Sequence, residues 1–348
     1  MSARVGVVLF NLGGPDNPAA VEPFLVNLFN DPAIIRVPQP LRYVIARLIA
    51  RRRAPLAREI YERLGGSSPI VRETRAQASA LEAELVKRDP VTAFKVVMAM
   101  RYWMPRSDEA AAALAEWKPD SLVLLPLYPQ FSTTTTSSSL ADWHRAASER
   151  GLTAATRAIC CWPTEPGLIR TFVDSLVPIL RSDRSLRVLF SAHGLPEKIV
   201  KAGDPYPGQV MATTRAVVET LAEEGFTDLD WVVCYQSRVG PLRWIGPSTD
   251  EEIRRAGADG RGVIVVPIAF VSEHSETLVE LDQEYRKLAT ASGVPRYERT
   301  PTPSVSAPFI AGLADLVRSA MAQSAPMSSG SPHRACTPVS QCPLVRVR

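Results

Sequence analysis

Short runs of apolar residues recur along the chain, and each is followed by a break and then by a stretch with helical periodicity. The first seven runs are almost continuously apolar, which is typical of strands buried on both faces of a parallel sheet. Helices are predicted between them, for example over residues 74–88 and 275–290. The predicted strands cover residues 5–10, 94–100, 121–127, 156–160, 187–192, 230–235 and 262–268, with a weaker eighth at 296–300.

This alternation of strands and helices indicates an α/β fold. The strands divide four and four, and VVLFNLGGP at 7–15 has a faint echo in RVLFSAHGLP at 187–196. We therefore predict two similar, doubly wound, Rossmann-like lobes with four-stranded parallel sheets facing a cleft, the N-terminal lobe over 1–165 and the C-terminal lobe over 166–323. The Ser- and Pro-rich segment 324–348 lacks periodicity and predicts a tail without regular structure.

Composition agrees with an ordinary soluble globular protein, because 46% of the 348 residues are hydrophobic and 22% are charged. The net charge of +4 is mild, and no basic block alternates with aromatic residues, so nucleic acid is not an expected partner. The N-terminus predicts a strand rather than a signal peptide, and no apolar run is long enough for a transmembrane helix. We therefore expect a cytoplasmic protein, with its five cysteines in a reducing environment.

A histidine stands at the end of one predicted strand, within LFSAHGLPEKIV at 189–200. In open α/β sheets, ligands bind beyond the carboxyl ends of the strands, so His193 is expected at a cleft. Taken alone, a histidine at such a turn is more often just a polar turn residue. The same strand-end rule, however, places a second group of titratable side chains nearby in the fold.

That second group lies in PIAFVSEHSETLVELDQEY at 267–285, which also follows a buried strand. A helix here would align Glu276, Glu280 and Glu284 on one face. Such a face is commonly solvated, and Ser275 would then cap the helix. Because the helix starts at a strand end, its carboxylates could instead carry protons or hard cations. Together with such a carboxylate, the strand-end histidine could form a general-base pair or a two-ligand metal site.

The segment LRYVIARLIARRRAPL at 41–56 is amphipathic and strongly basic. It predicts either a core helix with a solvated basic face or a helix that lies on an anionic membrane through residues 41–53. Both interpretations stay open at this point.

Several long blocks, in the same order, resemble the ferrochelatase family, whose members insert ferrous iron into a porphyrin in the last step of haem biosynthesis. The resemblance runs from LFNLGGP to about residue 320, and it implies two doubly wound lobes around a porphyrin cleft. The substrates it implies are Fe2+ and protoporphyrin IX, with protohaem and two protons as products. The blocks are AMRYWMP, LYPQFSTTTTSSSL, LFSAHGLPEKIVKAGDPYPGQV, CYQSRVGPLRWIGPSTDEEI and the acidic segment at 267–285.

By this resemblance, His193 matches the catalytic histidine, and Glu276 matches the carboxylate that faces it across the porphyrin. Either residue could serve as a ligand of the incoming iron, and the opposite division of roles, with His193 on the metal, stays open. Positions beside the site, or on a path for metal or protons, are matched by Glu273, His274, Glu280 and Asp282. Positions that line the pocket are matched by Leu12, Arg101, Tyr102, Tyr128 and Trp244.

Some ferrochelatases also hold a [2Fe–2S] cluster. Here the adjacent pair Cys160 and Cys161 could combine with Cys336 and Cys342 in the tail, since four thiolates suffice for such a cluster. The spacing departs from the family pattern, and Cys234 is expected in the core. Two other functions are open, a non-catalytic porphyrin or metal carrier and a chelatase for another tetrapyrrole or metal such as cobalt. The sequence also leaves open a homodimer, and coproporphyrin in place of protoporphyrin.

Overall fold

The structure is a computed structural model that describes residues 2–238, 240, 242–330, 341 and 343. The chain forms two compact units. Unit 1 consists of Met1–Cys161 with Leu313–Ser329, and unit 2 consists of Trp162–Gly312 with Gly330–Arg348. Helix α11 (Ala307–Ala322) begins in unit 2 and ends in unit 1.

Unit 1 is built on a parallel sheet with the strand order β2-β1-β3-β4-β9. Helices α3 (Ile70–Arg88), α4 (Ser107–Trp117) and α5 (Thr136–Glu149) pack against this sheet. Its central strands are apolar on both faces because helices cover both. The strands are β1 (Arg4–Asn11), β2 (Ala93–Met100), β3 (Ser121–Pro126), β4 (Ala155–Ile159) and β9 (Met327–Ser328).

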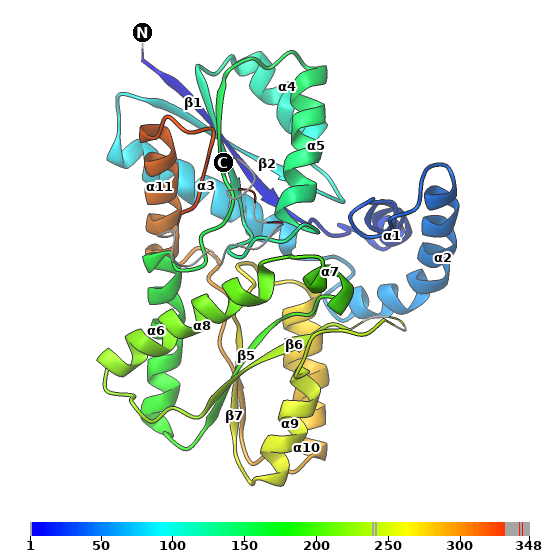
Figure 1. Cartoon of the computed structure of the whole chain (residues 1–348), viewed down its shortest axis with the longest axis vertical. Helices are drawn as coiled ribbons and strands as arrows, with labels where there is room; N and C mark the ends of the chain where they lie inside the picture. The colour runs from blue at the N-terminus through cyan, green and yellow to red at the C-terminus, as the bar shows by residue number, and fades with distance from the viewer. Residues whose placement is uncertain (1, 239, 241, 331–340, 342, 344–348) are drawn as a thin grey trace. The chain divides into compact units, whose positions relative to one another are not determined.

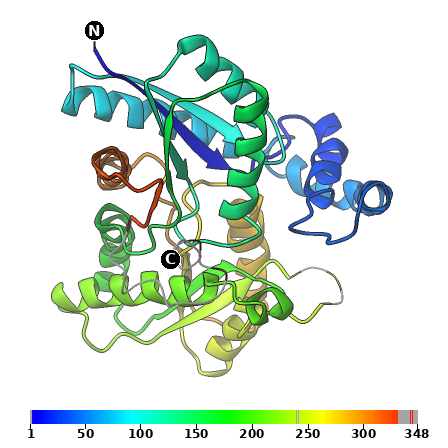
Figure 2. The ribbon, with the colours of Figure 1, turned by 45° about the horizontal axis from the view of Figure 1, so that its top comes forward.

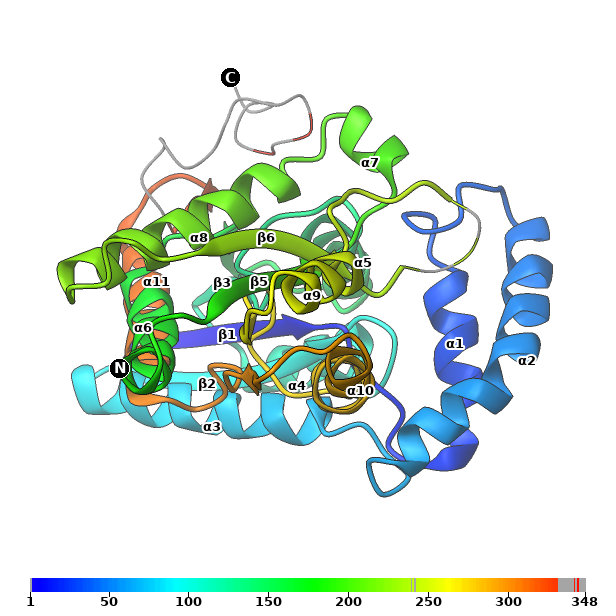
Figure 3. The ribbon, with the colours of Figure 1, turned by 90° about the horizontal axis from the view of Figure 1, so that it is seen from below.

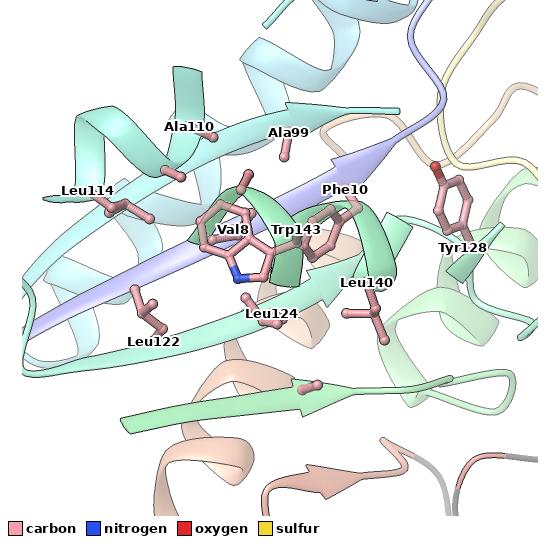
Figure 4. Close-up of a cluster of buried hydrophobic side chains, with 13 residues drawn as sticks. Val8, Phe10, Ala99, Ala110, Leu114, Leu122, Leu124, Tyr128, Leu140 and Trp143 are labelled. Carbon is pink, nitrogen blue, oxygen red and sulfur yellow. The ribbon is translucent and has the colours of Figure 1, made fainter. Parts of the chain in front are cut away.

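One core cluster of unit 1 centres on Trp143 of α5, which packs edge-on against Phe10 of β1 (Figure 4). Two further helices, α1 (Val21–Phe29) and α2 (Leu41–Glu62), follow a 3-10 turn at Pro18–Ala20. They pack on one another and form a helical arm beside the unit 1 sheet (Figure 2). This arm carries the basic segment singled out in the sequence.

Unit 2 has a second parallel sheet, with the strand order β6-β5-β7-β8. Helices α6 (Pro166–Ser182) and α8 (Tyr206–Glu223) pack together, as do α9 (Thr249–Ala258) and α10 (Arg286–Ala291). The two pairs lie on opposite sides of the strands (Figures 1 and 3). The short helix α7 (Glu197–Lys201) follows β5. The strands are β5 (Arg187–His193), β6 (Trp231–Gln236), β7 (Val263–Pro267) and β8 (Tyr297–Arg299).

The predicted α/β class and all eight predicted strands are confirmed. Two features differ from the prediction. Unit 1 has a fifth strand, β9, inside the segment expected to lack regular structure, because β9 pairs with β4 over only two residue pairs and needs no apolar run of its own. The helix expected at 275–290 begins as a π-helix, η2 (Glu276–Tyr285), and only then continues as α10.

The expected cap at Ser275 is wrong, since this residue already has helical dihedral angles and its side chain makes no capping hydrogen bond. The hydroxyl oxygen of Thr277, rather than that of Ser275, accepts a hydrogen bond from the backbone N–H of His274, at 3.0 Å. Of the helices that the structure describes, none is both long and apolar enough to cross a membrane.

Candidate active site

His193 is the last residue of β5, the strand that pairs with both β6 and β7. It therefore lies at the middle of the carboxyl edge of the unit 2 sheet, where ligands bind in doubly wound folds. The imidazole Nδ1 lies 2.6 Å from the carbonyl oxygen of Gly194. Because a carbonyl oxygen only accepts, Nδ1 carries the proton of the neutral ring and Nε2 keeps its lone pair. The side chain is 38% exposed, so Nε2 can take up a proton or meet a metal ion.

Glu276, the first residue of η2, lies between two histidines. Its Oε1 is 3.6 Å from Nε2 of His193, and its Oε2 is 3.7 Å from Nε2 of His274. His274 donates from Nδ1 to the carbonyl oxygen of Ser272 at 2.9 Å, which turns its Nε2 toward the carboxylate. Each oxygen of Glu276 thus faces one imidazole ring.

The two histidines decide the ionisation of Glu276. Burial raises the pKa of this carboxyl group, but the charges of His193 and His274 outweigh burial and lower the pKa to about 2. Burial likewise lowers the pKa of His274, yet the contact with Glu276 raises it overall. Glu276 is therefore a carboxylate near neutral pH, held beside a ring that can become a cation.

Glu280, four residues further along η2, lies in a cage of hydrogen-bond donors. Ser237 donates from its backbone N–H at 2.8 Å and from its hydroxyl at 2.5 Å. Gln236 Nε2 and the Tyr285 hydroxyl donate at 3.2 Å and 3.0 Å. Ser237 has a φ of 62°, a left-handed conformation that is rare without glycine and that often marks functional sites. Burial, together with the charge of Glu276, raises the pKa of Glu280, so the two carboxyl groups differ in proton affinity.

Comparison with known proteins decides the family of this chain. Residues 4–321 match the family model of ferrochelatase. The chain is 53% identical over 324 residues to the ferrochelatase of Phenylobacterium zucineum, covering 92% of each. It is 50% identical over 347 residues to that of Caulobacter vibrioides, covering 99% of this chain and 98% of the relative. The chain belongs to the ferrochelatase family.

Membership in the ferrochelatase family confirms the predicted activity, a metal chelatase that forms protohaem by iron insertion. Among solved structures, SirB from Bacillus subtilis with Fe3+ is similar to this chain with a TM-score of 0.55. That protein is 12% identical, and the match covers 92% of this chain and 96% of SirB. At this identity the likeness concerns the fold, and it agrees with the α/β architecture described above.

Trp244 is the one pocket position of the ferrochelatase pattern that lies beside His193 in unit 2. The two ring centroids are 6.3 Å apart, and Trp244 forms an isolated bridge with Pro196. A Cβ atom on Gly194 would lie 3.1 Å from the carbonyl oxygen of Gln236 and 3.2 Å from the Trp244 ring. Glycine at 194 therefore leaves room for the Trp244 ring beside the carboxyl end of β5.

Glu273 and Asp282, which match the proposed metal or proton path, both form ion pairs with one arginine. Arg299 of β8 lies 2.9 Å from Glu273 and 2.7 Å from Asp282. Within the described part of the chain, no three His, Cys, Asp or Glu side chains converge closely enough to hold a metal ion.

The other pocket positions, Leu12, Arg101, Tyr102 and Tyr128, lie in unit 1. Tyr102 is buried, and its hydroxyl donates to Asp31 at 2.8 Å. Arg101 lies 2.9 Å from the same carboxylate, and its Nε donates to Ser138 at 2.7 Å. Tyr128 lies at the far end of the core cluster from Leu114 and Leu122 (Figure 4). Their role in porphyrin binding stays a prediction.

Sequence reasoning missed several residues that build this site. Gln236 ends β6, Ser237 follows it, and Arg299 ends β8, so the strand-end rule that located His193 would also have found them. Tyr285 lies five residues after Glu280, a spacing that brings side chains together in a π-helix and escapes a search at three or four residues. Asp31 had no strand end or periodic pattern to indicate it.

The thiols of Cys160 and Cys161 are buried in unit 1, with their sulfur atoms 3.4 Å apart. Cys161 also lies 3.6 Å from the hydroxyl of Ser329. Cys336 and Cys342 lie outside the described residues. Cys234 is fully buried, which confirms its expected place in the core.

Proposed function

We propose that this chain uses His193 and Glu276 to insert Fe2+ into protoporphyrin IX, which forms protohaem and releases two protons. One observation carries the proposal. Nε2 of His193 lies 3.6 Å from Oε1 of Glu276, a carboxyl group whose pKa is lowered, at the carboxyl end of a central strand. Iron and porphyrin are both substrates in this scheme.

A free-base porphyrin carries two inner N–H groups, and both protons must leave when iron binds the four nitrogens. An imidazole is a suitable acceptor near neutral pH. When Nε2 of His193 takes a proton, the ring becomes a cation beside the negative charge of Glu276. This contact stabilises charge that develops during the reaction and contributes little to substrate binding, as catalysis requires.

We assign the handling of iron and of the departing protons to Glu276 and Glu280. Carboxylate and imidazole groups are both suitable ligands for iron. The lowered pKa of Glu276 favours the charged form that binds a metal ion. The raised pKa of Glu280 favours uptake of a proton. Neighbouring carboxyl groups with opposite pKa shifts are a common arrangement for divided acid and base roles.

The direct test is an anaerobic assay with the purified chain, protoporphyrin IX and ferrous iron. We expect the free-base absorption bands to give way to those of protohaem. Porphyrin binding without metalation would instead support a non-catalytic carrier. Faster insertion of cobalt, or faster reaction with coproporphyrin, would reassign the metal or the tetrapyrrole.

The arm helix α2 presents a surface that suits an anionic membrane. Its buried residues are three alanines and Tyr61, whereas Leu41, Val44 and Leu48 are 57%, 51% and 66% exposed. Their spacing of three and four residues makes them one stripe, and exposed arginines such as Arg51 adjoin it. We infer that residues 41–53 contact lipid, since exposed apolar stripes beside basic residues are typical of interfacial helices. The predicted cytoplasmic location stays a prediction.

Reversing the charge of Arg51 and Arg52 to glutamate is expected to weaken binding to phosphatidylserine vesicles by about 10-fold or more, because each basic residue near such a surface contributes about 1 kcal/mol. Vesicle co-sedimentation measures this. The same reversal at Arg181 and Arg184, which are exposed in unit 2, is the matched control. Unchanged binding after the α2 reversal would contradict lipid contact. A shift from dimer to monomer would show that the stripe serves a homodimer, which the sequence leaves open.

Two of the four thiolates that a [2Fe–2S] cluster needs, Cys160 and Cys161, lie together in unit 1. Thiolate sulfur is the usual ligand of such clusters, so this pair fits half of the ligand set. If Cys336 and Cys342 complete it, anaerobically purified protein is expected to contain iron and to absorb visible light without added porphyrin. A sample without iron and without visible absorption would contradict the cluster.

A further inference from the structure

The carboxylates of Glu273 and Asp282 converge on one guanidinium group, that of Arg299 at the end of β8. Its Nη1 is 2.9 Å from Glu273 Oε1, while Nε and Nη2 are each 2.7 Å from one oxygen of Asp282. The contact with Asp282 is a two-pronged pair, which the planar fork of arginine forms and the point charge of lysine does not. The Arg299 side chain is only 9% exposed.

These contacts hold the helix that carries the candidate catalytic carboxylates. Glu273 precedes η2 by three residues, and Asp282 is in its second half, so Arg299 spans most of the helix. Arg299 is itself fixed by the pairing of β8 with β7. The Tyr297 hydroxyl of the same strand donates to the carbonyl oxygen of Leu281 at 2.6 Å. Because π-helices are rare and mostly a single turn, a ten-residue one needs such support from outside.

The same contacts occupy two other carboxylates of this segment, those of Glu273 and Asp282. Glu273 also accepts hydrogen bonds from the Thr277 hydroxyl at 2.5 Å and from the Thr302 backbone N–H at 3.0 Å. Burial raises the pKa of Glu273, but Arg299 outweighs burial and lowers it. Glu273 is therefore an ionised and fully engaged carboxylate, which is a poor position from which to bind incoming iron.

We propose that Arg299 is a positioning residue of the metalation reaction, which holds η2 so that Glu276 stays opposite His193 and which keeps Glu273 and Asp282 from binding the iron. This inference rests on the proposed function, because it gives Glu276 the productive contact with the metal. Arg299 itself touches neither substrate in this scheme.

The test compares Arg299→Gln, which removes the charge, with Arg299→Lys, which keeps the charge and loses the fork. We expect Arg299→Gln to lower kcat by about 10–100-fold, the range seen when supporting groups around metal ligands are lost. Porphyrin affinity, measured by fluorescence quenching, should change by less than about 2-fold. The released carboxylates should also make excess ferrous iron inhibitory, which a merely structural defect would not do. Arg299→Lys should fall between Arg299→Gln and the unmodified chain.

A second change separates charge from packing. Adding Asp282→Asn to Arg299→Gln removes one uncompensated carboxylate, so it should relieve iron inhibition and restore kcat by about 3-fold or more, as expected for coupled neighbours. Arg296→Gln is the matched control. Arg296 lies on the same segment but pairs with Asp183 and Glu298, and its loss should change kcat by less than about 2-fold.

Circular dichroism and thermal unfolding establish which variants fold. If Arg299→Gln does not fold, Arg299→Lys decides. If the folded Arg299 variant has the same kcat as the unmodified chain and is not inhibited by excess iron, the inference is overturned. Loss of activity in Glu276→Gln together with an unaffected Arg299 variant would sink this inference alone. Full activity of Glu276→Gln would instead sink the proposed role of Glu276, on which the inference depends.

Discussion

Replacing His193 with alanine is expected to lower kcat for anaerobic iron insertion by about 10²–10⁴-fold, the usual contribution of a positioned general base. The physical reason is the geometry at the end of β5. Nδ1 is held by the carbonyl oxygen of Gly194, so Nε2 is the nitrogen that can take a pyrrole proton. The measurement is the rate of protohaem formation at saturating porphyrin and iron.

The matched control for this variant is His144→Ala, because His144 is an exposed residue of α5 in unit 1. It should metalate porphyrin at the unmodified rate. Porphyrin binding by His193→Ala should persist, and added imidazole should recover part of the activity if the lost group is a base. A raised KM for iron with kcat preserved would reassign His193 to the metal. Unchanged kinetics would contradict both roles.

Replacing Glu276 with glutamine should reduce kcat by about 10²-fold or more, in line with the loss of a preorganised charge that acts on the transition state. Glutamine keeps the shape of the side chain but cannot offset a positive charge on His193 or bind iron as an anion. Because the pKa of Glu276 is about 2, the carboxyl group is ionised across the neutral range, so the substitution removes a full charge. Paired measurements of kcat and of porphyrin affinity test this.

Turnover in Glu276→Gln should fall far more than porphyrin affinity, since the carboxylate is proposed to act on iron and protons. Glu284→Gln offers a control on the same π-helix, at an exposed position. An equal loss of turnover and porphyrin affinity would show that Glu276 holds the porphyrin. A similar loss in Glu284→Gln would point to a general effect on η2.

Much of the fold was predictable because its strands are buried on both faces. That burial leaves continuous apolar runs, and the runs locate the strand ends at which His193 and Gln236 now lie side by side. The strand-end rule is thus enough to bring a histidine to the candidate site. The family resemblance, by contrast, supplied the pairing of His193 with Glu276, which no local pattern indicates.

What could not be predicted depends on contacts between distant segments. The π-helical form of η2 is one case, since its sequence fits an α-helix equally well. The ion pairs that hold it come from Arg299, which lies on the separate strand β8. The arm helix α2 is another, because its apolar stripe suggests a core-facing side, whereas its buried residues are mostly small alanines. Asp31 is a third, since three of its side-chain partners, Arg101, Tyr102 and Ser138, lie more than sixty residues away in sequence.

The course of α11 has a consequence for exchanging parts between relatives. This helix begins in unit 2, ends in unit 1, and leads into β9, which pairs with β4. A chimera joined at a single point after residue 161 would therefore unite most of one parent's unit 1 with the edge strand of the other. If β9 of one parent fits β4 of the other poorly, the backbone N–H and C=O groups of β4 stay unpaired and can pair with strands of other chains. Recombination between relatives is best made with two crossovers, so that residues 313–329 travel with 1–161.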